Sequence, residues 1–242
     1  MVMTVQNVLV EGVRTGAPLD WRSAARMIDS TLLQADAPRS RISTLCAEAA
    51  KYGFYSVMVN PSNVAQCVKE LRGTEILVGS VVGFPLGATT SGAKLAEAQD
   101  VLKLGAREVD MVINLGALKS GDRDTVRSEI QSLASLCHSK DAKLKAILEM
   151  GLLTTEEKIL ACQLAAMASV DFVKTSTGFA ESGATVSDVQ LMRGVVGQLI
   201  GVKASGGVRN AADFIQMVDA GANRIGTSNG AAILHELGAP EL

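Results

Sequence analysis

Residues 172–209 read FVKTSTGFAESGATVSDVQLMRGVVGQLIGVKASGGVR and contain a complete strand–helix–strand unit. Two short β-rich runs, 172–176 and 200–204, enclose a segment at 186–196 in which apolar residues recur with the period of a helix. Each run ends in a turn rich in glycine and hydroxyl side chains. This pattern predicts two parallel strands joined by a crossover helix.

The same alternation of strand and helix extends along the chain. The predicted strands lie at 26–33, 55–60, 76–84, 108–114, 143–149, 172–176, 200–204 and 224–227. The predicted helices follow them at 39–52, 65–72, 92–104, 124–139, 155–168, 186–196, 211–220 and 230–237. Strict alternation predicts a parallel sheet buried on both faces, and eight such units in 242 residues fit a (β/α)8 or TIM barrel. A doubly wound open sheet is the alternative, but no GxGxxG turn follows the first strand.

The composition indicates one domain over residues 1–242. Hydrophobic residues make up 48% of the chain and aromatic residues only 3%, so the core is expected to be aliphatic. No linker or shift of composition marks a second domain. Residues 1–20 are expected to form a short N-terminal helical extension, with Asp20 capping a short helix before the first strand.

Charge and cysteine content predict a cytoplasmic protein. Charged residues make up 20% of the chain and the net charge is −2, which excludes extensive disorder and a basic nucleic-acid-binding surface. The four cysteines form no CxxC pair and are predicted to be reduced, buried thiols. The N-terminus lacks the basic start of a secretory signal, and no uninterrupted apolar stretch suits a membrane span. We therefore expect neither a membrane nor a nucleic acid as partner.

Three of the charged residues inside predicted strands stand out as candidates for the chemistry, because an unpaired charge is costly there. Asp110 lies in the fourth strand, Lys174 in the sixth and Lys203 in the seventh. The active site of such a barrel lies at the carboxyl ends of its strands, and the alternation of side chains supports an inward aim for both lysines. Two close ammonium groups repel each other, so that at least one amine should have a lowered pKa and be able to form a Schiff base with a carbonyl. Asp110 would then move protons or hold a water molecule, whereas a purely structural ion-pair network is the alternative.

Three loops after the last strands resemble anion-binding sites. They comprise residues 175–178, 205–209 and 226–230. Their glycines let backbone N–H groups approach a phosphate, and the loops after the seventh and eighth strands form the usual phosphate site of these barrels. Ordinary turn chemistry is the alternative for each loop.

Metal chemistry and a Ser-His-Asp triad have little support in the sequence. The two histidines, His138 and His235, lie in helical segments without a second His or Cys at ligand spacing. Both are expected at the surface, and neither lies at a strand end, where a triad would need it. We therefore expect neither a metal nor a cofactor.

The chain resembles the deoxyribose-phosphate aldolase family. The resemblance rests on VVGFPLGATTSGAKLAEAQDVLKLGAREVDMVINLGALKSGD at 81–122, on FVKTSTG at 172–178 and on GVKASGGVR at 201–209. It covers nearly the whole chain in the right order. It implies a metal-free class I aldolase on a (β/α)8 barrel, which reversibly cleaves 2-deoxy-D-ribose 5-phosphate to D-glyceraldehyde 3-phosphate and acetaldehyde.

The resemblance also implies roles for individual residues. Lys174 resembles the Schiff-base lysine, Lys203 the neighbour that lowers its pKa, and Asp110 the acid of a proton relay. Asp29 and Thr31 match an auxiliary polar cluster near the first strand. The positions that match the phosphate-binding loops are Gly178, Gly206, Gly207, Val208, Arg209, Gly226, Ser228 and Asn229. The implied partners are a sugar phosphate and an aldehyde, and a homodimer is compatible with the sequence.

Four positions depart from the family pattern. Ser30 stands where many members have His, and Met58 where many have Cys. Phe179 stands where some members have a Lys that helps to hold the phosphate. A C-terminal Tyr found in some members has no counterpart, because the only tyrosines are Tyr52 and Tyr55.

Two other functions are compatible with these motifs. One is a different Schiff-base sugar-phosphate aldolase or transaldolase. The other is a catalytically inactive sugar-phosphate-binding barrel, which ranks last because a binding protein has no need of two facing lysines and an acid.

Overall fold

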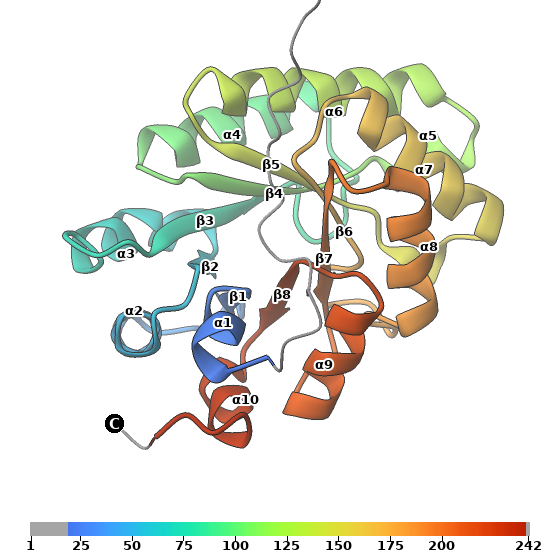
Figure 1. The fold of residues 1–242 in the computed structure, drawn as a ribbon. Coiled ribbons are helices and arrows are strands. Elements are labelled where there is room, and N and C mark those ends of the chain that lie inside the picture. The colour runs from blue at the N-terminus through green and yellow to red at the C-terminus, as the bar shows by residue number, and fades with distance from the viewer. Residues whose placement is uncertain (1–18, 241–242) are drawn as a thin grey trace, which may run out of the picture.

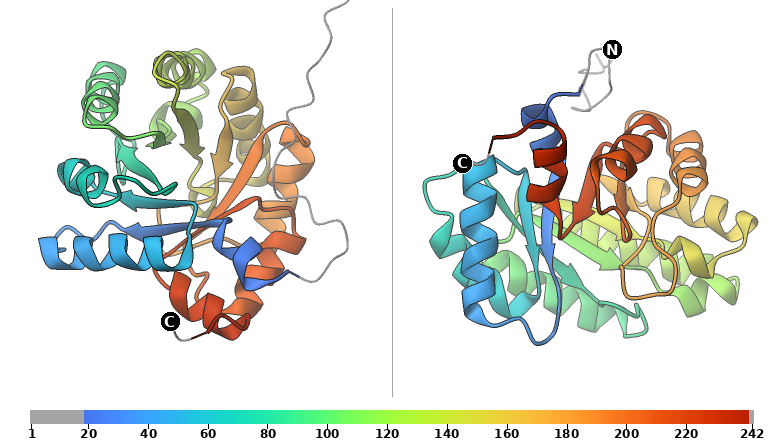
Figure 2. Two further views of the ribbon diagram at one scale, coloured as in Figure 1. Left: turned by 60° about the vertical axis from the view of Figure 1, so that its left-hand side comes forward. Right: turned by 90° about the horizontal axis from the view of Figure 1, so that it is seen from below.

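The computed structural model describes residues 19–240, and in this range eight parallel strands close into a barrel surrounded by helices (Figures 1 and 2). The strands are β1 (Ile28–Leu32), β2 (Ser56–Val59), β3 (Leu77–Val82), β4 (Glu108–Val112), β5 (Lys143–Ile147), β6 (Phe172–Lys174), β7 (Gly201–Ser205) and β8 (Arg224–Thr227). They pair in chain order, and β8 returns to β1. The predicted (β/α)8 barrel is confirmed, and the open sheet is wrong.

Each strand leads into a helical segment on the outside of the barrel. The helices are α1 (Trp21–Ala25), α2 (Arg39–Tyr52), α3 (Val64–Glu70), α4 (Ser91–Lys103), α5 (Leu115–Lys119), α6 (Arg123–His138), α7 (Thr155–Met167), α8 (Val186–Val196), α9 (Ala211–Asp219) and α10 (Gly230–Glu236). Two 3-10 turns, η1 (Pro61–Asn63) and η2 (Met150–Leu152), precede α3 and α7. All eight predicted helices are present to within one or two residues at each end.

The predicted cap before the first strand is confirmed, and one helix was missed. The Asp20 side chain accepts from the N–H of Ser23 at 2.7 Å and starts α1. Residues 1–18 and 241–242 lie outside the described part, and so does most of the predicted extension at 1–20. The missed helix is α5. Asn114, predicted as the last residue of a strand, accepts from the N–H of Ala117 and begins this helix instead.

Aliphatic side chains fill the space between the barrel and its helices. Val173, Val202 and Ile225 are fully buried, and strand alternation points them away from the barrel interior. The four cysteines, Cys46, Cys67, Cys137 and Cys162, are buried and free, as predicted. One close approach in the interior explains a glycine: a Cβ on Gly201 would collide with the ring of Phe172, its partner across the sheet.

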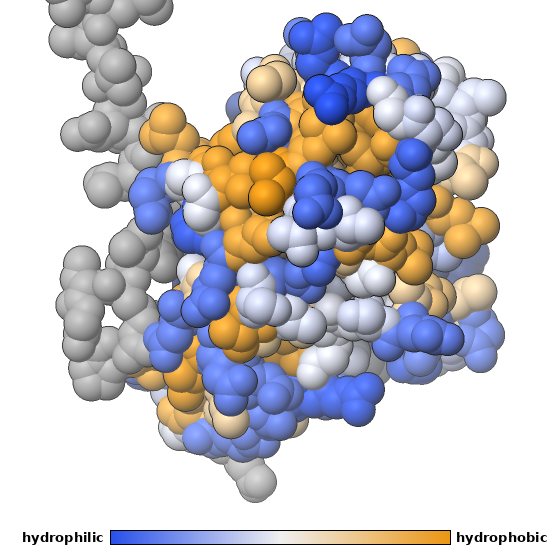
Figure 3. All heavy atoms as spheres, turned by 90° about the vertical axis from the view of Figure 1, so that its right-hand side faces the viewer, coloured by the Kyte–Doolittle hydropathy of each residue, from blue (hydrophilic) through white to orange (hydrophobic). Residues whose placement is uncertain are grey.

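The outer surface mixes polar and apolar side chains, as Figure 3 shows for one face. Among residues 19–240, the large apolar side chains that are exposed are Leu86, Leu104, Leu152, Met167, Phe179 and Leu199. None of the helices in this range has both the length and the apolar character needed to cross a bilayer.

A buried ion pair on the outside of the barrel fixes the end of β4. The Lys94 ammonium lies 2.7 Å from the Glu129 carboxylate, and both side chains are fully buried between α4 and α6. Lys94 also donates to the carbonyl oxygen of Val112, the last residue of β4, at 2.8 Å. This contact lies two residues beyond Asp110 and therefore anchors the strand that carries it.

We expect Glu129→Leu to lower the free energy of unfolding by about 3–5 kcal/mol, because it leaves the Lys94 charge buried and unpaired. Urea unfolding followed by circular dichroism measures this loss. The double variant Lys94→Met/Glu129→Leu removes both charges at similar volume and should recover most of the lost stability. Equal losses in both variants would contradict the role of the ion pair.

Candidate active site

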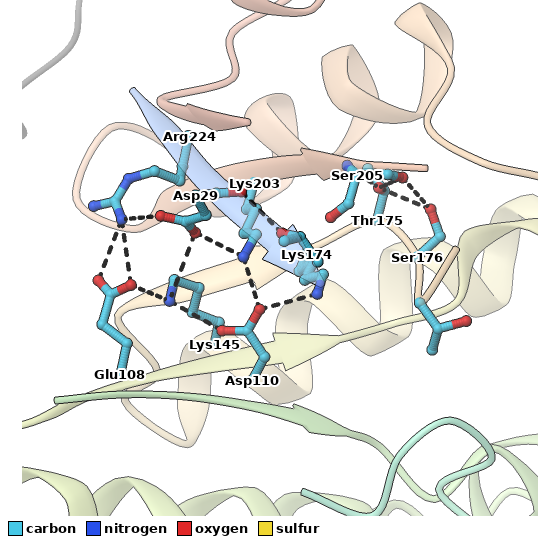
Figure 4. A network of polar contacts seen from close by, with 12 residues as sticks. Asp29, Glu108, Asp110, Lys145, Lys174, Thr175, Ser176, Lys203, Ser205 and Arg224 are labelled. Carbon is cyan, nitrogen blue, oxygen red and sulfur yellow. Dashed lines mark hydrogen bonds and ion pairs between the residues drawn. The ribbon is translucent and has the colours of Figure 1, made fainter. Parts of the chain in front are cut away.

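The two predicted lysines and the predicted acid meet inside the barrel (Figure 4). Lys174 and Lys203 are register partners on the neighbouring strands β6 and β7, and both side chains point inward. The Asp110 Oδ2 atom lies 2.9 Å from the Lys174 Nζ and 2.8 Å from the Lys203 Nζ. One carboxylate oxygen therefore holds two amines close together.

The two lysines differ in how many carboxylates hold them. Lys203 contacts Asp29 Oδ2 at 2.6 Å as well as Asp110. Lys174 is paired with Asp110 alone among the described residues. Lys203 is therefore stabilised as an ammonium by two opposite charges, whereas Lys174 is the amine that can lose its proton more easily.

Three further charged side chains belong to the same cluster, and sequence reasoning missed them. Lys145 on β5 lies 2.6 Å from Glu108 and 3.0 Å from the other Asp110 oxygen. Arg224 on β8 contacts Asp29 at 2.8 Å and Glu108 at 3.3 Å. The sequence carried a signal for Glu108 alone, which lies two residues before Asp110 and so shares its strand face. The pairing of the Lys145 position with Asp110 is visible only in the structure.

Burial and neighbouring charges tune the ionisation of this cluster. Burial alone would raise the pKa of Asp110, but the surrounding Lys145, Lys174 and Lys203 hold that pKa well below its usual range. Burial is the largest influence on Lys174; with the help of Lys203 and Lys145, and against the attraction of Asp110, it lowers the pKa of Lys174 to about 8. Asp110 is thus an ionised acceptor, and Lys174 supplies a free amine near neutral pH, as a nucleophile requires.

Asp29 is a structural counter-charge at this site. It is fully buried, its Oδ1 accepts from Ser56 and Arg224, and its Oδ2 pairs with Lys203. Thr31 donates to the Asp29 carbonyl oxygen at 2.8 Å. Asp29 and Thr31 therefore lie together near the first strand, and the negative charge of Asp29 would repel a phosphate.

The turn after β6 is tied to the end of β7. Ser176 donates to the Ser205 carbonyl oxygen at 2.6 Å, and Thr175 donates to the same oxygen at 3.1 Å (Figure 4). These side-chain bonds end β6 at Lys174, two residues before the predicted end of the strand. Thr177 donates to Glu149 at 2.5 Å and ties the same turn to the loop after β5.

The predicted phosphate loops lie together at the carboxyl ends of β6, β7 and β8. Gly178, Gly206 and Gly207 all have positive φ angles, of 82°, 83° and 86°, which side chains rarely adopt. The loop after β8 is bonded to the loop after β7, because Thr227 donates to the Val208 carbonyl oxygen at 2.8 Å.

The remaining loop positions join the same group. The Asn229 amide donates to the Arg209 carbonyl oxygen at 3.4 Å, and Ser228 donates to Asn229 at 3.1 Å. Gly226 faces Asp29 across the sheet, and a Cβ there would lie 3.0 Å from the Lys203 Cε and from the Ser205 Oγ. Gly226 therefore keeps space open beside the two lysines.

Three of the positions that depart from the family pattern line the barrel or its rim. Ser30 and Met58 are buried on β1 and β2. Phe179 is more than half exposed in the loop after β6, and its ring packs edge to face against Phe84 with centroids 5.2 Å apart. An aromatic pair therefore occupies the position where some family members place a cation.

The two histidines take no part in this cluster. His138 is exposed and lies 3.0 Å from Asp171, as the surface prediction requires. His235 is only partly exposed and forms a 2.7 Å hydrogen bond with Tyr52, so for this residue the prediction was wrong. Within residues 19–240, no group of three or more His, Cys, Asp or Glu side chains is arranged to hold a metal ion.

Comparisons with known proteins agree with this geometry. A model of the DeoC/LacD family aldolases matches residues 20–237. A deoxyribose-phosphate aldolase of Streptococcus pneumoniae serotype 19F (strain G54) is 54% identical over 209 residues, which cover 86% of this chain and 94% of that protein.

Solved structures give the same result. A crystal structure of a Coccidioides immitis protein matches with a TM-score of 0.87 at 40% identity, covering 96% of this chain and 92% of that one. The tetrameric deoxyribose phosphate aldolase of Aeropyrum pernix matches with a TM-score of 0.83 at 35% identity, covering 89% of this chain and 91% of that one.

We expect the Lys174 amine to titrate near pH 8, because its pKa is lowered to about that value. Competitive acetylation with a trace of acetic anhydride between pH 6 and 11, read by mass spectrometry, measures this titration. Labelling should rise with pH and reach half of its maximum near pH 8, whereas an N-acetyl-lysine amide standard in the same tube reaches half of its maximum at about pH 10.4. If Lys174 titrated at the same pH as the standard, the lowered pKa of Lys174 would be contradicted.

Proposed function

The chain belongs to the DeoC/LacD aldolase family, and we propose that it is a deoxyribose-phosphate aldolase that works through a Schiff base on Lys174. It reversibly cleaves 2-deoxy-D-ribose 5-phosphate to D-glyceraldehyde 3-phosphate and acetaldehyde. The observation that carries the choice of lysine is the unequal pairing of the two amines: Lys203 has two carboxylate partners and Lys174 has one.

The first step is attack by the neutral Lys174 amine on the C1 aldehyde of the open-chain sugar. Loss of water from the resulting carbinolamine gives an iminium ion. Lys203 is held between Asp29 and Asp110, and its charge disfavours a second positive charge on Lys174 before the attack.

The second step breaks the C2–C3 bond. A base removes the proton of the C3 hydroxyl, the C2–C3 electron pair moves toward the iminium nitrogen, and glyceraldehyde 3-phosphate leaves with C3 as its aldehyde carbon. The enamine that remains takes a proton at C2, and hydrolysis releases acetaldehyde and the Lys174 amine. The ionised Asp110 carboxylate, 2.9 Å from the Lys174 nitrogen, is the group that we propose holds the water that moves these protons.

The sugar phosphate is proposed to bind at the loops after β6, β7 and β8. Three glycines with positive φ give backbone N–H groups access to an anion there, and Arg209 adds a positive charge in the same loop. The loops after β6 and β7 directly follow the strands that carry the two lysines. This order suits a substrate whose phosphate and aldehyde are at opposite ends.

A homodimer and a cytoplasmic location are separate proposals. Exposed apolar side chains such as Leu199 and Met167 are compatible with a subunit interface, and four free, buried cysteines suit a reducing compartment. Light scattering coupled to size-exclusion chromatography measures the subunit number directly.

We expect Lys174→Ala to lower the rate of glyceraldehyde 3-phosphate release in a coupled assay at least about 10³-fold, because no other amine takes over the covalent step. Borohydride added with the substrate should trap an adduct at Lys174 in the unaltered protein and none in the variant. An adduct that survives the substitution would contradict the role of Lys174.

Two further measurements separate the alternative functions. A preference for dihydroxyacetone over acetaldehyde as donor would indicate another Schiff-base aldolase or a transaldolase. Calorimetric binding of the sugar phosphate without release of acetaldehyde would indicate an inactive binding barrel.

We expect the KM for 2-deoxyribose 5-phosphate to be at least about tenfold higher in Gly207→Asp than in Gly207→Asn, because a carboxylate beside the phosphate repels it. Both residues tolerate the positive φ of this position, and a Cβ there meets nothing within 4 Å, so the pair differs only in charge. Unphosphorylated 2-deoxyribose is the control substrate, and its KM should be similar in the two variants. Equal KM values for the phosphorylated sugar would place the phosphate elsewhere.

A further inference from the structure

We propose that Glu108 and Arg224 are positioning residues whose opposite charges set the balance that lets the Lys174 amine lose its proton near neutral pH. Neither lies next to Lys174, and each acts on it through the charged residues that lie between them. The inference deepens the proposed function, because it concerns how the Schiff-base lysine is kept ready to react.

Glu108 and Arg224 lie on the far side of the cluster from Lys174 (Figure 4). Arg224 Nη1 bridges Asp29 at 2.8 Å and both oxygens of Glu108 at 3.3 Å. Glu108 in turn accepts from Lys145 at 2.6 Å. Arg224 therefore reaches Lys203 through Asp29, and Glu108 reaches Asp110 through Lys145.

The charges of the cluster cancel only when Lys174 is neutral. Its carboxylates are Asp29, Glu108 and Asp110, and the cations that pair with them are Lys145, Lys203 and Arg224. Every one of these side chains is at most 5% exposed. A protonated Lys174 adds one positive charge without a carboxylate of its own, and an uncompensated charge in a dry interior is unfavourable.

The charged groups nearest to this cluster lie outside the barrel interior: the exposed Arg26 is 5.5 Å from the Tyr55 ring centroid, and Asp171 is bonded to the exposed His138. The Arg224 guanidinium lies 3.4 Å from the ring centroid of Tyr55 and 5.2 Å from that of Phe172, so aromatic rings cover it. Ser56 contributes a neutral hydroxyl to Asp29. Glu149, from the loop after β5, is turned to Thr177.

A purely structural ion pair and a charge-balancing pair give different results on substitution. Removing either partner of a structural pair destabilises the protein in the same way. In a balancing pair, Glu108→Gln leaves the cluster more positive and makes the neutral amine more favourable, whereas Arg224→Met leaves it more negative and makes the ammonium more favourable.

The test is the pH titration of Lys174 by competitive acetylation, with the pH dependence of kcat/KM for 2-deoxyribose 5-phosphate beside it. We expect the Lys174 titration to move to lower pH in Glu108→Gln and to higher pH in Arg224→Met, each on the order of one pH unit. The double variant Glu108→Gln/Arg224→Met should titrate close to the unaltered protein. The charge-conserving variants Glu108→Asp and Arg224→Lys should move the titration much less than the neutral ones.

Shifts in the same direction for the two neutral variants, or no shift in either, would overturn the proposal. If Arg224→Met does not fold, as judged by circular dichroism, the comparison of Glu108→Gln with Glu108→Asp decides alone: a shift in Gln that is absent in Asp supports the proposal, and equal behaviour overturns it. The acetylation titration needs no sugar, so opposite shifts in a protein that releases no glyceraldehyde 3-phosphate would refute the proposed function and leave the charge balance standing.

Discussion

The charged interior of this barrel depends on one carboxylate oxygen that contacts two amines. Asp110 Oδ2 lies within 3 Å of both Lys174 and Lys203, in an interior without access to bulk water. Such an arrangement is stable only if the surrounding charges nearly cancel, because each uncompensated charge in a low dielectric costs several kcal/mol. The rest of the interior follows from this requirement: Asp29 pairs with Lys203, and Lys145 takes up the second Asp110 oxygen.

A (β/α)8 barrel is well suited to hold such a cluster. Alternate residues of parallel strands point into the barrel, so that six strands can each contribute a charged side chain without breaking the backbone ladder. The opposite residues, such as Val173 and Val202, meet the helices and give the aliphatic core that the composition predicted. A barrel with layers of branched apolar residues would be simpler to stabilise, and the charged interior is therefore a sign of function.

The sequence predicted the fold and the reactive centre, but not the whole charge cluster. Lys174 and Lys203 were recognisable because each interrupts an apolar strand. Glu108 and Arg224 are the first residues of β4 and β8, where a charged side chain ordinarily reaches solvent, and Lys145 lies in a strand that begins with the exposed Lys143. The closure and tilt of the barrel bring these positions inside, and neither is visible in a linear pattern. Glu108 alone had a sequence signal, because it lies two residues before Asp110 in the same strand. The missed helix α5 is only five residues long, and it depends on the side-chain cap of Asn114 rather than on periodicity.

The amine chemistry and the binding of an anion belong to adjacent motifs in the sequence, but they lie in separate parts of the structure. The lysines and their counter-charges lie within the strands, where neighbouring side chains fix them, whereas the anion-binding glycines lie in loops that are tied together by Thr227 and Asn229. Under the proposed charge balance the amine chemistry depends on the buried charges, so that the loops can change without disturbing it. The aromatic pair Phe84–Phe179 at the rim illustrates this freedom, because it places apolar surface where some family members have a cation, while the ion pairs of Asp110 with both lysines are in place. Variation at the rim should therefore alter which phosphate or aldehyde binds, while the reactivity of Lys174 stays with the cluster below.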